Sequence, residues 1–559
     1  MAEGNDIIRQ RDALKAARSP FESHWDELAK LFMPFRVMQT GGLPDIPAAR
    51  EVFDSTPRQY ALILANGLAS LVMPREDTWF EFAPPRILRE DDSAVSYYRQ
   101  CSAIAREFLE GSNFYEEAQE CLIETPVFGT TALFCGDLDE DQKLYFRNQP
   151  IKTYYISEDA QGRVVSFYRD LELTAAQAAI EFGEDALPQA VRGKVGDPDQ
   201  AQTVDTYVHA VYRRREGAKK ETPENGDDSP AASRKWESCV VHETSKQKVA
   251  HTGYHEFPFA VHRYRRFGRC AYGFGPGSVG LSDARQLQFL EQLADVAAEK
   301  SVFPPLIAPS NLEGEIGQGA LEITYVDPSD PNAAALMREW ATTGRYDVAL
   351  DRLNQKRSQL SEIFHISLFQ LFAQRQEKQP LTATEASLVA GEKLTQFSPV
   401  FGRLVSEFLD PVLQRVFGVL LRANAFPPAP PSVVRALGSK ASVASPSLIY
   451  KNRVMLAMQQ RENQALMDFM TMAQPIMAVY PEAMDALRLP QIVRRTARNN
   501  GLREEDIREV EEIEAMQESR AQAAQAQQQM AMAEQGASAA AKLSSAAPGM
   551  AERMLGGIA

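Results

Sequence analysis

The hydrophobic period of this chain changes twice along its length, and the two changes restrict the folds open to it. Up to about residue 125, apolar residues recur at helical spacing. Between about 130 and 265 they form short β-branched or aromatic runs separated by turn residues, and after about 270 the helical spacing returns. A strand pattern between two helical regions predicts an α+β fold that is mainly helical, with an antiparallel sheet over 130–265.

The region before the strands contains several helix signals. Its apolar stripe recurs every seven positions, at Ile7, Leu14, Phe21, Leu28 and Phe35. Ser19–Glu22 has the pattern of a capping box with proline at the first helical position, which predicts separate helices over about 5–18 and 20–33. Asp54–Pro57 marks another helix start, and 93–125 contains two further helical stretches.

The strand region carries four features of its own. Ser157–Gly162 has the composition of a hairpin turn, and a helix over about 174–182 is expected to pack on the sheet. Residues 216–234 contain almost no apolar side chains, which predicts an exposed loop. The run His262–Arg266 alternates basic and aromatic residues, which fits a nucleic-acid-binding surface or, as we favour, an exposed strand face.

Helices return after a glycine-rich segment, Gly273–Ser278, which we interpret as a hinge because glycine has unusual backbone freedom. The apolar positions that follow predict a helix over about 282–301 and another over about 343–367. Between them lie short strand-like segments that are separated by proline and glycine residues. A polar loop, 370–380, comes after the second helix.

The C-terminal part begins with a capping box at Thr382–Glu385, which opens a long helix ending near Arg422. Pro399 and Pro411 are expected to kink this helix. Residues 426–447 are rich in Pro, Ala and Ser and are interpreted as a linker. Helical spacing continues to about residue 535, and the remaining residues have the composition of a disordered tail.

Composition excludes several classes of protein. The net charge is −15, which argues against a tight, sequence-reading nucleic-acid binder. The five cysteines form no CxxC pair, so we expect a reducing compartment and neither a disulfide scaffold nor a structural zinc module. No signal peptide is visible, and the longest apolar stretch, Gln59–Pro74, is shorter than a membrane-spanning helix, so no membrane partner is expected.

A search for catalytic motifs gives no site, so we expect no enzyme activity, no catalytic residues and no cofactor. There is no GxxxxGK[ST], HExxH or GxSxG sequence. Gly273–Ser278 precedes a helix but lacks the lysine and spacing of a phosphate-binding loop. His251 and His255 lie four residues apart in a strand-like context, where that spacing does not converge on one ion, so no metal site is expected.

The order of these segments resembles the head-to-tail connector (portal) proteins of short-tailed bacteriophages. The resemblance covers about residues 5–500. Four segments carry it, namely SPFESHWDELAKLFMP, VFDSTPRQYALILANGLASLVMPREDTWFEF, YGFGPGSVGLSDARQLQFLEQ and QPLTATEASLVAGEKL. The ordered series, rather than any single motif, identifies the family.

The family fold implies regions called wing, stem, clip and crown. By position they are a wing at 1–280 (helices 5–125, antiparallel sheet 130–265), stem helices 281–302 and 339–367, a clip 303–338 between them, a tunnel loop 368–382, a kinked wing helix 383–425, a linker 426–447, crown helices 448–535 and a disordered tail 536–559. The polar insertion at 216–234 has no counterpart that we can assign in the family pattern.

The resemblance also implies the function. It predicts a ring, expected to contain twelve subunits, at one capsid vertex, through which double-stranded DNA is packaged and later ejected. The implied partners are the major capsid protein, the terminase large subunit and tail adaptor or nozzle proteins. The implied location is the head-tail junction of the virion, after assembly in the host cytoplasm.

Six side chains are candidates for contact with DNA in the channel of such a ring. Three lie on the second predicted stem helix and three lie in the tunnel loop: Arg352, Lys356, Arg357, Gln374, Arg375 and Lys378. Cationic side chains can contact phosphates or can equally be solvated. The loop is expected to project inward as a constriction.

Simple geometry agrees with a ring. Twelve helices spaced about 10 Å apart give a circumference of about 120 Å. Subtracting a helix diameter of about 10 Å leaves a bore of about 28 Å, wide enough for duplex DNA. An acidic assembly with few basic contacts suits passage of DNA, because many Lys and Arg contacts would hold it.

Three other functions remain open from the sequence alone. One is a nucleotide-binding enzyme that uses Gly273–Ser278, for which binding calorimetry is the test. Another is an internal virion or ejection protein, which should lack the helix, small insert and helix unit over 281–367. The third is a generic helical oligomer, from which images of a ring with a central hole would distinguish the portal.

Overall fold

The computed structural model describes residues 2–35, 52–89, 91–139, 141–197, 199–214, 234–268, 270–302, 306–307, 338–339, 346–373, 399–437 and 446–451, with isolated positions between 469 and 538. The chain divides into two compact units, 1–455 and 456–559. The predicted crown helices beyond 451, the tail 536–559 and all but the last residue of the predicted loop 216–234 therefore lie outside the continuously described residues.

The first helix is continuous through its proline. Helix α1 spans Ala2–Phe32 and includes Pro20, so the prediction of two separate helices is wrong. The buried side chains of Trp25 and Phe32 pack on the same side of the helix. Arg18, itself buried, donates hydrogen bonds to the carbonyls of Ile151 (3.3 Å) and Tyr154 (2.6 Å). These tertiary contacts hold the helix on both sides of the proline, whose missing N–H costs one helical bond.

Three more helices complete the N-terminal region, at the positions that the sequence predicts. They are α2 (Thr56–Val72), α3 (Asp92–Glu110) and α4 (Phe114–Phe128). Asp91 caps α3 by accepting hydrogen bonds from the N–H groups of Ser93 and Ala94. Helix α4 ends at Gly129, whose φ of 73° lies in the left-handed region that glycine tolerates best.

The predicted single sheet is in fact two antiparallel sheets. The smaller has the strand order β3-β2-β9 and consists of β2 (Thr130–Leu138), β3 (Leu144–Gln149) and β9 (Phe259–Arg263). The larger is a meander of β4 (Tyr154–Glu158), β5 (Val164–Thr174), β6 (Val204–Arg213), β7 (Trp236–His242) and β8 (Lys248–Tyr254). The predicted hairpin turn between β4 and β5 is confirmed.

Pro150 begins a turn of 3₁₀ helix, Ile151–Thr153, that separates the two sheets. This turn interrupts the strand pattern because proline has no N–H to donate to a ladder. The two sheets nevertheless pack together, and the rings of Phe167 and Phe259 stack with their centroids 3.7 Å apart. The sequence pattern of alternating strands could not show this change of sheet, because both sheets have the same period.

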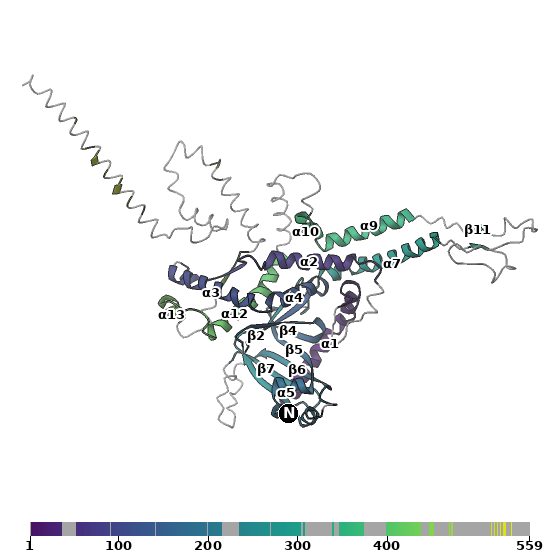
Figure 1. Cartoon of the computed structure of the whole chain (residues 1–559), viewed down its shortest axis with the longest axis horizontal. Helices are drawn as coiled ribbons and strands as arrows, with labels where there is room; N and C mark the ends of the chain where they lie inside the picture. Colours follow the sequence, from purple (N-terminus) through teal and green to yellow (C-terminus); the bar gives the residue numbers. More distant parts are fainter. Residues whose placement is uncertain are drawn as a thin grey trace, which may run out of the picture. The chain divides into compact units, whose positions relative to one another are not determined.

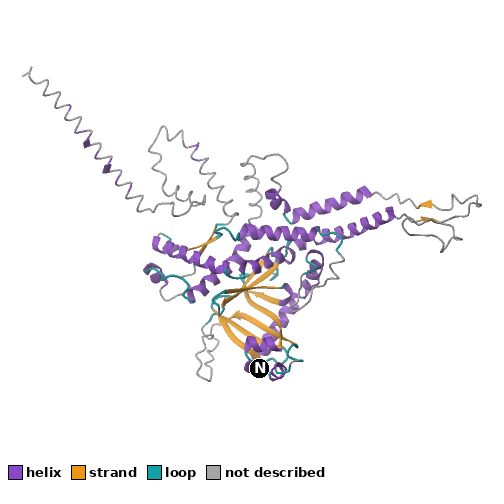
Figure 2. Ribbon diagram, viewed as in Figure 1, coloured by secondary structure: helices purple, strands orange, loops and turns teal. Residues whose placement is uncertain are grey.

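Helices cover both faces of the five-stranded sheet (Figure 2). Ile7 and Ile8 of α1 pack on one face, against Val208 and Val241. The other face carries α5 (Ala175–Phe182), which the sequence predicts, and α6 (Gln189–Val195), which it does not. Thr174 and Gln177 form a reciprocal capping box at the start of α5.

The segment interpreted as a linker, 426–447, contains regular structure. Helix α13 spans Pro431–Leu437 and packs on α3, with Val433 buried. Strand β12 (Ser447–Tyr450) then pairs antiparallel with β1 (Phe80–Ala83). The linker prediction is therefore wrong in part. A composition of Pro, Ala and Ser gives no local signal for these two short elements, which form by packing on α3 and pairing with β1.

The long helix before α13 is described from residue 399. A π-helical turn, Val405–Leu409, precedes α12 (Asp410–Arg422). Pro411 cannot donate to the helical ladder, and the residues before it adopt the wider bonding pattern of a π turn. A π turn is one of the features at which helices bend, so the kink at Pro411 stays a prediction. Within the described residues, no helix is both long enough and apolar enough to cross a bilayer.

Candidate functional site

Two long helices stand side by side and form the unit that the sequence predicts as a stem (Figure 1). They are α7 (Pro276–Val302) and α9 (Tyr346–Ile363). Their far ends lead to a short antiparallel pair, β10 (Leu306–Ile307) and β11 (Arg338–Glu339). Most of the predicted clip, 303–338, lies outside the described residues.

The structure changes the boundaries of both predicted stem helices. Helix α7 begins at Pro276, within the segment interpreted as a hinge. Glu339 belongs to a strand, so the second helix does not begin at 339. It ends at Ile363 rather than 367, because His365 has a positive φ of 53° and separates α9 from α10 (Ile366–Ala373).

Helix α10 occupies the beginning of the predicted tunnel loop, 368–382, and of the polar loop, 370–380. Its first residues are apolar, and Phe369 packs against Gly67 of α2. A Cβ at Gly67 would lie 2.2 Å from the Phe369 ring, so the absence of a side chain there permits the contact. Gln374, Arg375 and Lys378 lie outside the described residues.

The base of α7 is bound to the segment that precedes α2. The side-chain oxygen of Gln288 accepts hydrogen bonds from the backbone N–H groups of Phe53 (2.7 Å) and Asp54 (2.9 Å). Its amide nitrogen donates to the carbonyl of Asp54 at 2.7 Å. The buried Gln288 amide therefore uses both its oxygen and its nitrogen to bind the backbone of residues 53 and 54. These hydrogen bonds fix the position of α7 relative to this segment.

Ion pairs join α9 to α7 and to the segment that precedes α2. Lys356 lies 2.7 Å from Asp283 of α7. Arg357 lies 2.8 Å from Asp54 and 3.3 Å from Glu291. Two of the three basic residues predicted to contact DNA on this helix thus neutralise acidic side chains of their own subunit.

Arg352 differs from these two residues. Its side chain is exposed, and no ion pair joins it to another residue in the described part of the chain. Three of the six candidates for contact with DNA are described, and among these Arg352 is the one with an exposed cation that makes no ion pair. The helix pair as a whole carries seven acidic and five basic residues, so its excess charge is negative.

One face of α7 is apolar and exposed. Phe289, Leu293 and Val296 are 60%, 47% and 41% exposed. Their spacing of four and three residues places them on one stripe of the helix. An exposed apolar stripe of this kind on a long helix is typical of a surface that packs against another chain.

The glycine-rich segment is closely packed rather than free to bend. A Cβ at Gly273 would lie 2.4 Å from the carbonyl oxygen of Gly129, and one at Gly275 would lie 2.4 Å from that of Pro126. These glycines therefore permit close approach of the backbone to the end of α4. Close packing therefore requires these glycines, rather than the backbone freedom on which the hinge interpretation rests.

The basic run His262–Arg266 is largely internal, so the prediction of an exposed strand face is wrong. His262, Arg263 and Tyr264 are buried. Burial lowers the pKa of His262 to about 3, so this imidazole is neutral at physiological pH. The run cannot form a basic surface for nucleic acid through its central residues.

Arg263 forms a buried ion network. Its guanidinium pairs with Glu158 at the end of β4 and with Glu407 of the π turn, the latter at 2.8 Å. Its backbone N–H also donates to Glu407, at 3.0 Å. The arginine therefore links both sheets to the π turn that precedes α12.

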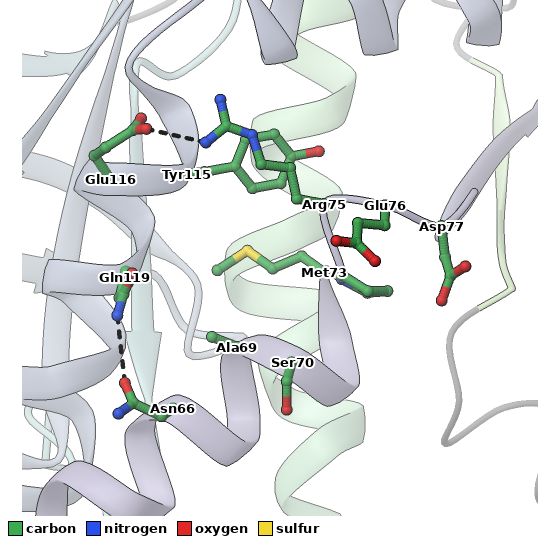
Figure 3. A pocket seen from close by; sticks show the side chains of 11 residues that line it. Asn66, Ala69, Ser70, Met73, Arg75, Glu76, Asp77, Tyr115, Glu116 and Gln119 are labelled. Atoms are coloured by element: carbon green, nitrogen blue, oxygen red, sulfur yellow. Dashed lines mark hydrogen bonds and ion pairs between the residues drawn. The ribbon is translucent and has the colours of Figure 1, made fainter.

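A groove of about 480 Å³ lies between the end of α2 and the start of α4 (Figure 3). Its polar side chains largely pair with one another. Arg75 lies 3.3 Å from Glu116, and Gln119 donates a hydrogen bond of 3.3 Å to Asn66. The lining contains no histidine or cysteine, and its acidic and basic groups are exposed. Nothing in this groove is arranged as a nucleophile with a base.

Sequence reasoning missed Gln288 and Asp54 as the residues that fix the stem. A signal was present for Gln288, because it shares a helical face with Leu281 and Ala284, where an apolar residue is expected. Asp54 was part of a helix start, but its ion pair with Arg357 joins positions 303 residues apart. No local pattern reports a contact at that separation.

Comparison with known proteins covers nearly the whole chain. A family model described as bacteriophage head to tail connecting protein matches residues 5–508. The portal protein of Salmonella phage epsilon15 is 24% identical over 550 residues, which cover 97% of this chain and 95% of that protein. The probable portal protein of Bordetella phage BPP-1 is 26% identical over 547 residues, with 96% and 95% covered.

Proposed function

Because this chain belongs to the family of bacteriophage head to tail connecting proteins and has portal function, we propose that identical copies close into a ring through which double-stranded DNA passes. The ring is proposed to contain twelve subunits and to sit at one capsid vertex, at the head-tail junction. The subunits would assemble in the host cytoplasm before the virion is complete.

The observation that carries the ring proposal is the apolar stripe of α7. Phe289, Leu293 and Val296 form a continuous apolar surface that is exposed to solvent in the single subunit. A contiguous apolar surface of this kind is typical of a contact with another subunit. Burying such side chains against a neighbour contributes about 1.5–3 kcal/mol each when burial is complete. Repeated around a closed ring, this contact would be made once per subunit pair, which fits a heterologous interface.

The charge of the stem supports passage of DNA rather than capture. Lys356 and Arg357 are committed to Asp283, Glu291 and Asp54. Each phosphate neutralised by a cation would add to the salt-dependent affinity for DNA. With those cations already paired, the proposed channel would hold a sliding polyanion only weakly, and Arg352 would supply a sparse contact.

The remaining parts are assigned roles by position. The residues after α10, including Gln374, Arg375 and Lys378, would form the constriction. The segment between β10 and β11 would bind the terminase large subunit during packaging and tail adaptor or nozzle proteins afterwards. The wing, 1–280, and the helix that ends with α12 would contact the capsid. The chain would act mechanically, without catalytic residues or a cofactor.

The experiment that tests the ring is a pair of substitutions in the stripe. Phe289→Asp and Leu293→Asp place charge on the proposed interface and should convert the purified assembly to smaller species, measured by native mass spectrometry and negative-stain imaging. Ile180→Asp is the matched control, because Ile180 is 87% exposed on α5. Rings that persist in both stripe variants would show that this surface does not close the assembly.

The constriction has its own test. Deletion of residues 374–380, which follow α10, should leave ring formation intact and reduce the retention of packaged DNA in virions. If packaging and retention both match the unmodified protein, these residues do not form a valve. This outcome leaves the ring proposal unaffected, because ring formation is measured separately.

A further inference from the structure

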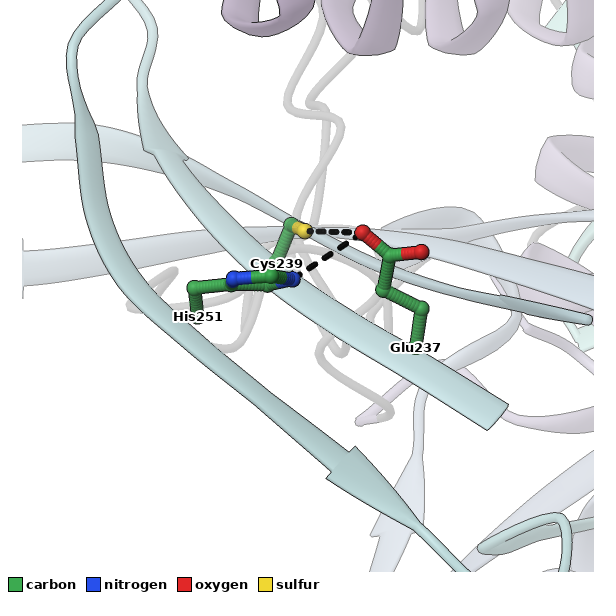
Figure 4. A group of neighbouring side chains, drawn as sticks. All are labelled: Glu237, Cys239 and His251. Carbon is green, nitrogen blue, oxygen red and sulfur yellow. Dashed lines mark hydrogen bonds and ion pairs between the residues drawn. The ribbon is translucent and has the colours of Figure 1, made fainter. Parts of the chain in front are cut away.

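Three side chains with metal-binding atoms lie together on the five-stranded sheet (Figure 4). They are Glu237 and Cys239 of β7 and His251 of β8, and their donor atoms all lie within 4.8 Å of one another. Cys239 and His251 are directly opposite in the antiparallel pair, so their side chains point to the same face. Glu237 shares that face because it lies two residues before Cys239.

We propose that Glu237, Cys239 and His251 bind a divalent cation of the zinc class. Zinc accepts a thiolate, an imidazole and a carboxylate together, whereas magnesium and calcium prefer oxygen ligands alone. Three protein ligands leave a fourth tetrahedral position for water. This site is independent of the portal function and of the stem.

The spacing of the donor atoms fits such an ion. Metal bonds of about 2.0–2.3 Å at tetrahedral angles place neighbouring donor atoms about 3.3–3.6 Å apart. In the structure, His251 Nε2 lies 3.0 Å from Glu237 Oε1, and Cys239 Sγ lies 3.7 Å from the same oxygen. Both of these separations need to change by less than about half an ångström for a zinc ion to be bound. The third, between Cys239 Sγ and the His251 donor nitrogen, is no longer than 4.8 Å, and rotation of the half-exposed His251 side chain can shorten it.

The surroundings orient the ligands. Arg214 Nε lies 4.0 Å from Glu237 Oε2, which leaves Oε1 turned toward the histidine and the cysteine. The Tyr212 hydroxyl lies 3.7 Å from Cys239 Sγ and can donate a hydrogen bond to a ligated sulfur. Such outer contacts are what hold metal ligands in position.

The degree of burial also suits a metal site. Cys239 is buried beneath α1, Glu237 is mostly buried, and the His251 side chain is 46% exposed. The ion would therefore sit at the rim of the packed face, reachable from solvent through the histidine. The sequence predicts no metal site from the spacing of His251 and His255, and both histidines are exposed. The partners of His251 are on β7, which spacing along the chain could not reveal.

The bound ion would tie β7 to β8. These strands already pair through their backbones, with a register irregularity between Val240 and Val241. A cation bridging Cys239 and His251 would add a side-chain link next to that irregularity. Because the folded site binds metal and the unfolded chain has no preformed site, binding stabilises the folded subunit.

The test uses cobalt(II) as a spectroscopic probe on the full-length assembly. We expect one cobalt ion per chain, a near-ultraviolet charge-transfer band from thiolate to cobalt, and loss of that band when zinc is added. Cys239→Ser should abolish the band. His251→Gln and Glu237→Gln should weaken cobalt binding by about tenfold or more.

Two control variants separate this site from other thiols and histidines. Cys270 is partly exposed, so Cys270→Ser tests whether the band comes from an unrelated thiol. His255→Gln tests a neighbouring exposed histidine. Both controls should keep the band and the stoichiometry of the unmodified protein.

Several results would contradict the metal site. Absence of the band in the unmodified protein, or a band that survives in Cys239→Ser or disappears in Cys270→Ser, overturns the proposal. Circular dichroism checks that each variant is folded. If Cys239→Ser does not fold, His251→Gln decides the question, because its exposed side chain can change without disturbing the core; unchanged cobalt affinity in that variant also overturns the proposal.

Discussion

Gln288 and Asp54 are joined by hydrogen bonds in both directions: the Asp54 N–H donates to Gln288 Oε1 at 2.9 Å, and Gln288 Nε2 donates to the Asp54 carbonyl at 2.7 Å. This contact fixes α7 to the segment that leads into α2. It lies next to the ion pair between Asp54 and Arg357, so both stem helices are held at one point.

Removing the Gln288 amide should destabilise the subunit. Gln288→Ala leaves the buried backbone groups of Asp54 without partners, and each such group costs about 1–3 kcal/mol. We expect unfolding at a lower urea concentration, with tryptophan fluorescence as the measure of unfolding. Gln286→Ala, at an exposed position of the same helix, is the control and should leave the midpoint nearly unchanged. Equal midpoints for the two variants would contradict the anchoring role.

The close approach at Gly275 can be tested by adding one methyl group. Gly275→Ala places a Cβ 2.4 Å from the Pro126 carbonyl oxygen and 2.8 Å from that of Thr125, so backbone must move. We expect a loss of several degrees in the thermal midpoint or failure to fold. Gly193→Ala has open space around the new Cβ and removes a glycine from helix α6, so it should gain about 0.5–1 kcal/mol. A flexible hinge would instead tolerate Gly275→Ala.

His262 should make the subunit sensitive to acid. Both ring nitrogens are buried without a hydrogen-bond partner in the described structure, and Arg403 is the charged group that adds to the effect of burial. The folded pKa, about 3, lies below the ordinary value of 6.5. The unfolded chain therefore binds the proton more readily, and stability present above pH 6.5 is lost as the pH falls toward 3.

His262→Leu should remove this part of the acid sensitivity and raise stability near pH 5, because it also removes two unpaired polar atoms. Thermal midpoints measured across the acid range check the prediction. The pKa of the exposed His255 is also lowered, first by partial burial and then by Arg422, so His255→Gln should change the curve in the same direction as His262→Leu but by less. Parallel curves for His262→Leu and the unmodified protein would exclude His262 as the source.

Arg263 should be essential for stability and irrelevant to nucleic-acid contact. Arg263→Ala leaves Glu407 without its arginine partner, whereas Glu158 keeps its ion pair with Arg266 at 2.6 Å. Breaking a buried ion pair in this way costs about 3–5 kcal/mol. Arg265→Ala, on an exposed residue of the same run, should have little effect on unfolding. Denaturant unfolding distinguishes the two, and similar midpoints would mean that the ion network is not stabilising.

Local sequence patterns predicted much of the element order correctly. The helix start at Asp54–Pro57, the hairpin turn at Ser157–Gly162 and the helix near 174–182 all depend on residues within a few positions of one another. Capping boxes and turns of this kind are short-range interactions, so the sequence contains all of their partners. The ordered series of segments also indicated the family that the comparisons show.

The candidate sites depended on contacts that no spacing rule contains. The sequence indicated a basic run at His262–Arg266 but could not show that its centre is buried. It placed Lys356 and Arg357 on one helix but could not show that Asp283 and Asp54 neutralise them. Burial and pairing follow from packing between distant segments.

The amino-acid sequence by itself determined the fold class, the succession of helices and strands, and the acidic balance of the chain. Tertiary structure alone decided that α1 continues through Pro20, that the strands divide into two sheets, and that Phe80 pairs with Tyr450. The physical reason is range. Propensity, capping and turn chemistry act over a few residues, whereas burial and strand pairing are chosen by whichever distant surfaces the whole chain brings together.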